Sequence, residues 1–358
     1  MARPATATIN LDAIRQNYLL AKSVAPKQGA LAIIKANAYG HGAVEVAKAL
    51  SKDADGFGVA CIEEAIELRN AGISLPILLL EGFFTADELP IISDQNLWCA
   101  VHNADQIDII ANAPLNKPIT AWLKLDNGMH RLGITPGEYK EAFHKLSALP
   151  QVEHVVLMSH FSAADEPELN TTAEQIQILD TLADELKAPI SMANSAGTLE
   201  HDNARRDWQR PGIILYGASP FAEAHKLADQ LKPAMTLSSE VIAVREIEPG
   251  ESVGYSATWT CDKPTRVGTV AMGYADGYPR HAKNGTPVLV DGHKSRIIGR
   301  VSMDMLAVDL SDIPDAKVGS YVELWGENLL ASEVAACCDT IPYTLFTGIT
   351  RRVHKKYI

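Results

Sequence analysis

Short apolar runs alternate with segments of helical period along the first two thirds of the chain. Each run has the length of a buried strand, and turn residues or proline close most of the segments between them. Residues 62–71 and 171–187 are examples of the helical period. The strand-like runs lie near residues 31–35, 57–61, 76–80, 97–101, 119–125, 153–159, 189–193 and 212–216. Parallel strands alternating with helices in this way predict an α/β fold, specifically a TIM-like (β/α)8 barrel.

The pattern changes after Pro233. Short β-branched runs, broken by Gly, Pro, Asp and Asn, replace the helical periods. They lie at residues 237–244, 265–272, 288–290, 297–301, 306–310 and 321–325. We therefore expect a barrel over residues 11–232 and a mostly-β C-terminal domain over residues 233–358. A further run at residues 5–9 precedes a helix that we expect to start near Asp12, a residue type suited to an N-cap.

Length and composition indicate a globular protein of two domains, because 358 residues exceed the usual size of one core. A net charge of −12 argues against a nucleic-acid partner. The five cysteines include no CxxC pair, and the eleven histidines include no HExxH spacing, so we expect neither disulfides nor a metal site. No apolar leader opens the chain, and no apolar stretch of about 18 residues occurs. These features predict a cytoplasmic protein with no membrane span.

One lysine stands where a wholly apolar run stops. Residues 31–34 suit a strand buried on both faces, Lys35 follows directly, and Gly40 and Gly42 interrupt the chain before a helical run near Ala43. In a parallel α/β fold, ligand sites are built at the carboxyl ends of the strands. Lys35 is therefore a candidate for chemistry, although a lone lysine at a strand end more often extends its amine to solvent, and the rest of the chain decides between the two.

Seven segments of the chain, taken together, resemble one family. They are AIIKANAYGHG, WLKLDNGMHRLG, SHFSAAD, RPGIILYG, VGYSATW, MGYADGYPR and GRVSMDM. In this order and spacing, from about residue 5 to residue 353, they are similar to the fold-type III alanine racemases, which hold pyridoxal 5′-phosphate (PLP) as a Schiff base. The resemblance implies interconversion of L-alanine and D-alanine with PLP as the cofactor. It also implies that residues 1–10 pair with the C-terminal domain.

The resemblance implies four catalytic residues. Lys35 corresponds to the Schiff-base lysine and first base, whose amine must lose a proton although a solvated lysine has a pKa of about 10.4. Tyr255 corresponds to a second base on the opposite face of the substrate, supplied by the other subunit of a head-to-tail homodimer. Arg210 faces the pyridine nitrogen, and since a guanidinium only donates, it leaves that nitrogen unprotonated. His160 supports this apparatus through a hydrogen bond.

Further residues are implied as contacts of the cofactor and the substrate. Arg131 would contact the cofactor's phenolic oxygen and the substrate carboxylate, and Lys124 stands where many relatives carry a carbamylated lysine. The phosphate contacts would be Tyr39, Ser195, Gly212 and Ile213, and the substrate segment would be Met303 and Asp304, with the backbone N–H of Met303 as a donor. Tyr274, on the substrate side, and Tyr343, on the cofactor side, would narrow the entry channel. One position departs from the pattern, because Ser191 stands where some relatives carry a histidine that supports the arginine at the pyridine nitrogen.

The resemblance leaves other functions open. A racemase of broader specificity, acting on serine or a basic amino acid, is the nearest alternative, because the motifs do not define the width of the pocket. A PLP-dependent decarboxylase of the same architecture would carry an acidic partner for the pyridine nitrogen, which Arg210 disfavours. A PLP-binding protein without turnover would have one domain and no counterpart of Tyr255, which the long β region disfavours.

Overall fold

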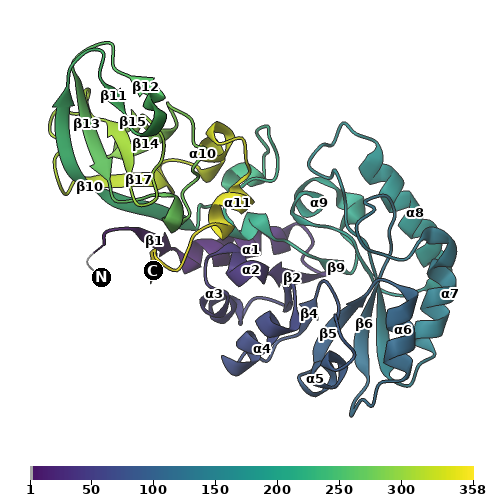
Figure 1. Cartoon of the computed structure of the whole chain (residues 1–358). Coiled ribbons are helices and arrows are strands. Elements are labelled where there is room, and N and C mark those ends of the chain that lie inside the picture. The colour runs from purple at the N-terminus through teal and green to yellow at the C-terminus, as the bar shows by residue number, and fades with distance from the viewer. Residues whose placement is uncertain (1–2) are drawn as a thin grey trace.

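The structure, a computed structural model, describes residues 3–358. Its first part is a closed barrel of eight parallel strands, as the sequence predicts (Figure 1). Each strand pairs with the next, and the last pairs with the first. The strands are β2 (Gly29–Ile33), β3 (Gly56–Val59), β4 (Ile77–Leu79), β5 (Leu97–Val101), β6 (Ile119–Lys124), β7 (Val152–Met158), β8 (Ile190–Ser191) and β9 (Trp208–Gln209).

Helices follow the barrel strands and cover the outside of the barrel (Figure 1). Both helical segments named from the sequence form, as α4 and α8. The first helix begins one residue before the expected Asp12, and its cap is Asn10, whose side-chain oxygen accepts a hydrogen bond from the Ala13 N–H at 2.9 Å. The helices are α1 (Leu11–Ser23), α2 (Lys35–Tyr39), α3 (Ala43–Leu50), α4 (Ile62–Asn70), α5 (Glu88–Asp94), α6 (Ala104–Ala111), α7 (Pro136–Ser147), α8 (Thr171–Leu186) and α9 (Ser195–Glu200).

The eighth strand is not where the sequence predicts it. The run at 212–216 forms a 3-10 turn, η2 (Ile213–Tyr216), and the strand is the two-residue β9 at Trp208–Gln209. All four side chains of η2 are fully buried. The prediction fails because a short apolar run reports burial, and burial alone does not distinguish a strand from a turn of helix.

Three tryptophans fill the interior of the barrel. Trp98 of β5 stacks on Trp122 of β6 with ring centroids 5.7 Å apart, and its edge meets Trp208 of β9 at 5.3 Å. A Cβ on Gly29 would lie 2.3 Å from the Trp208 ring, so glycine at the start of β2 makes room for this cluster. Trp208 and Gly29 begin their strands, which places this contact at the amino-terminal end of the barrel.

The chain after Pro233 forms the expected mostly-β structure. Its large sheet runs β15-β14-β17-β10-β1-β18, with β13 paired to β10 and β16 paired to β13, while β11 and β12 form a separate ribbon. The strands are β10 (Met235–Ile247), β11 (Ser252–Val253), β12 (Trp259–Thr260), β13 (Thr265–Val270), β14 (Pro287–Val290), β15 (His293–Arg296), β16 (Leu306–Asp309), β17 (Tyr321–Trp325) and β18 (His354–Tyr357). Two helices, α10 (Ala331–Cys337) and α11 (Pro342–Thr347), lie between this sheet and the barrel (Figure 1).

One of the predicted runs in this region is not a strand. Residues 297–301 make only an isolated bridge, from Ile297 to Val308, and the strand is β15, just before them. Ile297, Ile298 and Val301 are nonetheless buried, so the run again marks the core and not a strand.

Both ends of the chain join the large sheet. The strand β1 (Thr6–Ile9) pairs antiparallel with β10 and parallel with β18, and Figure 1 shows the two termini side by side. Arg3 and Arg352, which lie just before β1 and β18, both form ion pairs with the fully buried carboxylate of Asp276. Within residues 3–358, no helix has the length and apolar character needed to cross a bilayer.

Candidate active site

The carboxyl ends of the barrel strands open into a cavity of about 890 Å³. Its walls come from the loops after the strands and from α10 and α11 of the C-terminal region. Ten of the residues predicted from the sequence line it: Lys35, Tyr39, Lys124, Arg131, His160, Ser195, Arg210, Gly212, Ile213 and Tyr343. The barrel therefore gathers at one end residues that lie far apart in the sequence, as the positions of the strand ends require.

Lys35 begins a short turn of unusual handedness. The four residues after it, Ala36 to Tyr39, all have φ between 48° and 54°, which is left-handed helical conformation. Such backbone costs an L-residue about 1 kcal/mol or more, so it persists only where the surroundings fix it. Gly40 closes the turn at φ 82°, where a Cβ would lie 2.1 Å from the carbonyl oxygen of Phe346. The turn places Lys35 and Tyr39 in the same cavity.

Two side chains outside the predicted set hold this turn. Glu64 accepts the Ala36 N–H through one carboxylate oxygen at 2.6 Å and the Ala60 N–H through the other at 2.8 Å. His41 is fully buried, and its Nδ1 lies 3.1 Å and 3.0 Å from the carbonyl oxygens of Ala38 and Tyr39. Burial lowers the pKa of His41 to about 3, so the ring is neutral and Nδ1 carries the donated proton.

The predicted phosphate contacts lie together at one wall of the cavity. The Ser195 hydroxyl accepts the Gly212 N–H at 2.8 Å, and Asn194 caps α9 by accepting the Gly197 N–H at 2.9 Å. A Cβ at Gly212 would lie only 2.9 Å from the hydroxyl oxygen of Tyr39, so glycine is needed for the close approach. Burial raises the pKa of Tyr39, which keeps its phenol protonated and able to donate.

The guanidinium of Arg210 is hydrogen-bonded to Ser191, the residue that departs from the family pattern. Its Nη1 donates to the hydroxyl of Ser191 at 2.5 Å, and its Nη2 donates to the carbonyl oxygen of Ser159 at 2.5 Å. Burial lowers the pKa of Arg210 to about 10, which still leaves it charged at neutral pH. Among the described residues no hydrogen bond uses Nε of Arg210, so this donor stays available.

The cavity contains more positive than negative charge. Lys124 is 6% exposed, and burial, followed by Arg210 and Arg131, lowers its pKa to about 8. Burial and the same cations lower the pKa of His160, which is therefore neutral. Of the lining residues, Glu81 and Asp165 are the acidic ones. The arrangement suits an anionic ligand.

The four remaining predicted residues, called the Tyr255 group below, lie on the C-terminal region and outside this cavity. Tyr255 and Met303 are 68% and 53% exposed, and neither lines the cavity. The Tyr274 N–H donates to the Ser302 carbonyl at 3.0 Å, which ties Tyr274 to the Met303 segment. Asp304 forms an ion pair with Arg352 at 2.6 Å. Figure 1 shows β11 and β12, which flank Tyr255, at the end of the sheet remote from the barrel.

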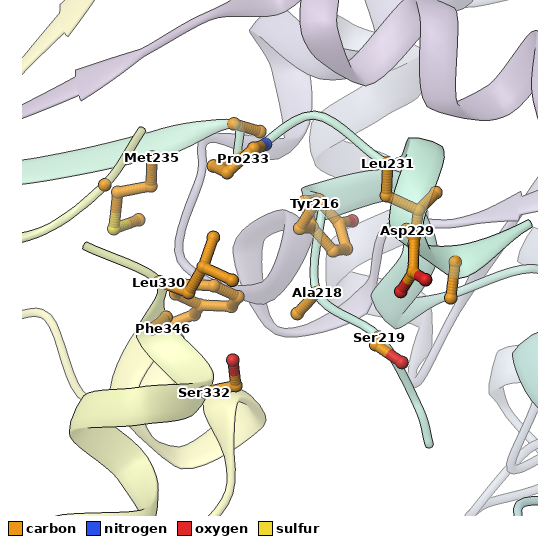
Figure 2. A pocket seen from close by; sticks show the side chains of 15 residues that line it. Tyr216, Ala218, Ser219, Asp229, Leu231, Pro233, Met235, Leu330, Ser332 and Phe346 are labelled. Atoms are coloured by element: carbon orange, nitrogen blue, oxygen red, sulfur yellow. The ribbon is translucent and has the colours of Figure 1, made fainter. Parts of the chain in front are cut away.

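A smaller cavity of about 170 Å³ lies at the junction of the two parts of the chain. Figure 2 shows Tyr216 and Pro233 on the barrel side and Leu330 and Phe346 on the other side. It contains none of the predicted site residues. Within residues 3–358 no group of three or more His, Cys, Asp or Glu side chains is arranged to hold a metal ion.

The sequence reasoning missed several of the residues that shape the site. Glu64 lies in the first turn of α4, where an acidic residue is common, and nothing in the sequence indicates that it reaches Ala36. Asp276 lies inside one of the quoted motifs, but nothing there indicates that it is buried with two arginines. Gln175 lies in α8, outside every motif, and no local signal marks it.

Comparison with known proteins agrees with this geometry. The family model described as "Alanine racemase, N-terminal domain" matches residues 9–220, and "Alanine racemase, C-terminal domain" matches residues 234–357. An alanine racemase of Pseudomonas syringae is 56% identical over 99% of both chains, and a catabolic alanine racemase of Pseudomonas putida is 55% identical over the same share. The crystal structure of a biosynthetic alanine racemase from Pseudomonas aeruginosa superposes with a TM-score of 0.97 at 50% identity, covering 99% of each chain.

Glu64 offers a test of how the turn after Lys35 is held. Glu64→Gln replaces one accepting oxygen by an NH2 group, which would face a backbone N–H. We expect the free energy of unfolding to fall by about 1 kcal/mol, measured by urea denaturation. Glu67→Gln, at an exposed position of the same helix, is the control and should change nothing. Equal stability of the two variants would contradict this role for Glu64.

Proposed function

The chain belongs to the alanine racemase family, and we propose that it interconverts L-alanine and D-alanine with two bases, Lys35 of one subunit and Tyr255 of a second. One observation carries the proposal. Ten of the predicted residues line the barrel cavity around Lys35, whereas the Tyr255 group lies outside it on the C-terminal region, with Tyr255, Tyr274 and Met303 exposed. Racemisation requires a proton donor on each face of a planar carbon, so a second chain that brings its Tyr255 group to this cavity would complete the site.

The cavity fits PLP in its donor set. Lys35 would bind the cofactor through Nζ, and Ser195, Gly212, Ile213 and Tyr39 would hold its phosphate. The free Nε–H of Arg210 is a suitable donor to a ring nitrogen that carries no proton. When bound, PLP withdraws electrons from the substrate Cα and so acidifies its proton.

The protein's own groups then move the proton. Lys35 takes or returns the Cα proton on one face, and Tyr255 of the second subunit does so on the other. A phenol has a pKa of about 10, so Tyr255 needs a neighbour in the assembled site, and neutral His160 is suited to accept its hydrogen bond. Arg131 would hold the substrate carboxylate, with the Met303 N–H as a second donor and Asp304 beside it.

A homodimer follows from the same requirement. Tyr274 of the second subunit would narrow the entrance to the cavity together with Tyr343, while Tyr255 and Met303 would reach the substrate. The division into residues 1–10, 11–232 and 233–358 belongs to this proposal, because the last of these segments would supply the second base. The exposed apolar side chains of the Tyr255 group are in keeping with a surface that another subunit covers.

Lys124 is proposed to be carbamylated. Its neutral amine would attack the carbon of CO2, one C=O π bond would open to a carboxylate, and one proton would leave to solvent. The product is an anion beside Arg131, which reduces the surplus of positive charge in the cavity. The pKa near 8 favours this step, because only the neutral amine is a nucleophile.

The second base is testable by isotope exchange. In the Tyr255→Phe variant we expect racemisation to fall by about a thousandfold or more, because one face lacks its proton donor. Exchange of the Cα proton with deuterated water should persist for the enantiomer that Lys35 serves, as followed by NMR. Tyr321→Phe changes another exposed tyrosine of the C-terminal region and should leave both rates unchanged. Equal loss of exchange for both enantiomers would contradict bases on separate faces.

Carbamylation of Lys124 predicts a pH-dependent signal. Carbon-labelled bicarbonate should give a carbamate resonance in the wild-type protein and none in Lys124→Ala. Because the pKa lies near 8 and not at 10.5, the neutral amine is already abundant in mildly alkaline solution. The signal should therefore be strong above pH 8 and disappear as the pH falls below it, where the amine is protonated. Absence of the resonance at alkaline pH would disprove the modification.

A further inference from the structure

The carboxamide of Gln175 joins two loops of the cavity. Gln175 lies in α8, on the outer layer of the barrel (Figure 1), and is 1% exposed. Its Nε2 donates to the side-chain oxygen of Asn127 at 3.1 Å and to the carbonyl oxygen of His160 at 3.1 Å. Its Oε1 accepts the Ser162 N–H at 3.1 Å and the Ser162 hydroxyl at 3.2 Å. All the hydrogen-bonding capacity of the amide is thus used within the protein.

Asn127 fixes the orientation of this amide. Its Nδ2 donates to the backbone carbonyl oxygen of Gln175 at 2.7 Å, so its oxygen must face the Gln175 side chain. That oxygen can accept only from Nε2, and this leaves Oε1 of Gln175 to accept from Ser162. No other arrangement of the two amides satisfies every partner, so the pair has one stable geometry.

The two loops joined in this way carry two residues of the site. Asn127 belongs to the loop after β6 that leads to Arg131, and residues 160–162 belong to the loop after β7 that carries His160. Gly128, at φ 131°, lies against the Gln175 stem, with its Cβ position 3.7 Å from Cγ. Arg131 itself is exposed, and within the described chain its side chain donates to no protein group, so its position depends on the loop.

We propose that Gln175 is a positioning residue that couples the Arg131 loop to the His160 loop, so that the carboxylate-binding arginine and the histidine move as one unit. The inference rests on the proposed function for the roles of those two residues. The coupling itself is a property of the chain and can be measured without turnover. A misplacement of about 1 Å in such a group can reduce the rate by about a hundredfold.

Two substitutions separate the contributions of the donor and the acceptor of the Gln175 amide. Gln175→Leu removes both the donating NH2 group and the accepting oxygen at similar side-chain volume. Gln175→Glu keeps the acceptor toward Ser162 but places an oxygen against the oxygens of Asn127 and His160. Thr172→Val is the buried control, because the Thr172 hydroxyl has no partner among the described residues. Gln177→Leu is the exposed control on the same helix.

Hydrogen–deuterium exchange of the full-length protein, purified with PLP, is the decisive measurement. In Gln175→Leu we expect backbone exchange about tenfold faster or more in both loops, residues 126–131 and 160–165, and unchanged in the large sheet. In Gln175→Glu the Asn127 loop should loosen while the Ser162 N–H stays protected. Both controls should match the wild type. For Gln175→Leu, faster exchange in neither loop or in only one, or the same change in Thr172→Val, would overturn the proposal.

Steady-state kinetics of the Gln175→Leu variant test whether the coupling of the two loops affects the reaction. For Gln175→Leu we expect kcat/KM for alanine to fall by about 10- to 100-fold, with KM raised, while the visible absorbance of the lysine-bound cofactor is retained. Loosened loops with unchanged kcat/KM would overturn the positioning role. If the wild type did not racemise alanine but exchange still linked the two loops, the proposed function would fail and the coupling would stand.

Discussion

The cavity at the carboxyl end of the barrel holds more positive than negative charge, and this surplus determines what it can bind. Lys35, Lys124, Arg131 and Arg210 surround one space, and Glu81 and Asp165 supply the nearby negative charge. Lys124 and Arg210 are buried, and buried cations without counter-charge are costly, a cost that their lowered pKa values express. A phosphate dianion, a substrate carboxylate and a carbamate on Lys124 would each offset it. Such a cavity therefore gains free energy when its anions bind, and the folded state gains with it.

The remaining structure holds these charges in place. The tryptophan cluster around Trp122 fills the barrel below the cavity, and the left-handed turn after Lys35 is fixed by Glu64 and His41. Arg210 is held by Ser191 and by main-chain carbonyl groups. On the C-terminal region, Asp276 pairs with Arg3 and Arg352 and so ties the Tyr274 segment to both ends of the chain. If a second subunit completes the site as proposed, these tertiary contacts would lower the cost of ordering it on assembly.

Much of this could be predicted from the sequence, for identifiable reasons. Short apolar runs located seven of the eight barrel strands, and motif resemblance located Lys35 and the other cavity residues. The strand β9 was missed because the neighbouring 3-10 turn is more apolar than the strand itself. The left-handed turn could not be predicted either, since its sequence of Ala, Asn, Ala and Tyr has no residue that demands positive φ. Tertiary contacts from Glu64 and His41 impose it.

Residues that act through others were the hardest to find. Gln175 looks like an ordinary polar position of an outer helix, and only the fold shows that it is buried between two loops. Ser191 appeared to be a loss of support for Arg210, yet its hydroxyl supplies that support directly. In both cases hydrogen-bond partners distant in sequence decide the role, and no local pattern records them.

The central claim is that each site takes Lys35 from one subunit and Tyr255 from the other. Co-expression of Lys35→Ala with Tyr255→Ala, each inactive alone, tests it directly. Random pairing makes half of the dimers mixed, and each mixed dimer would hold one intact site, so we predict recovery of about a quarter of wild-type activity. Activity no higher than that of either variant alone would contradict the account, because a site built within one chain has no intact copy in any of these dimers.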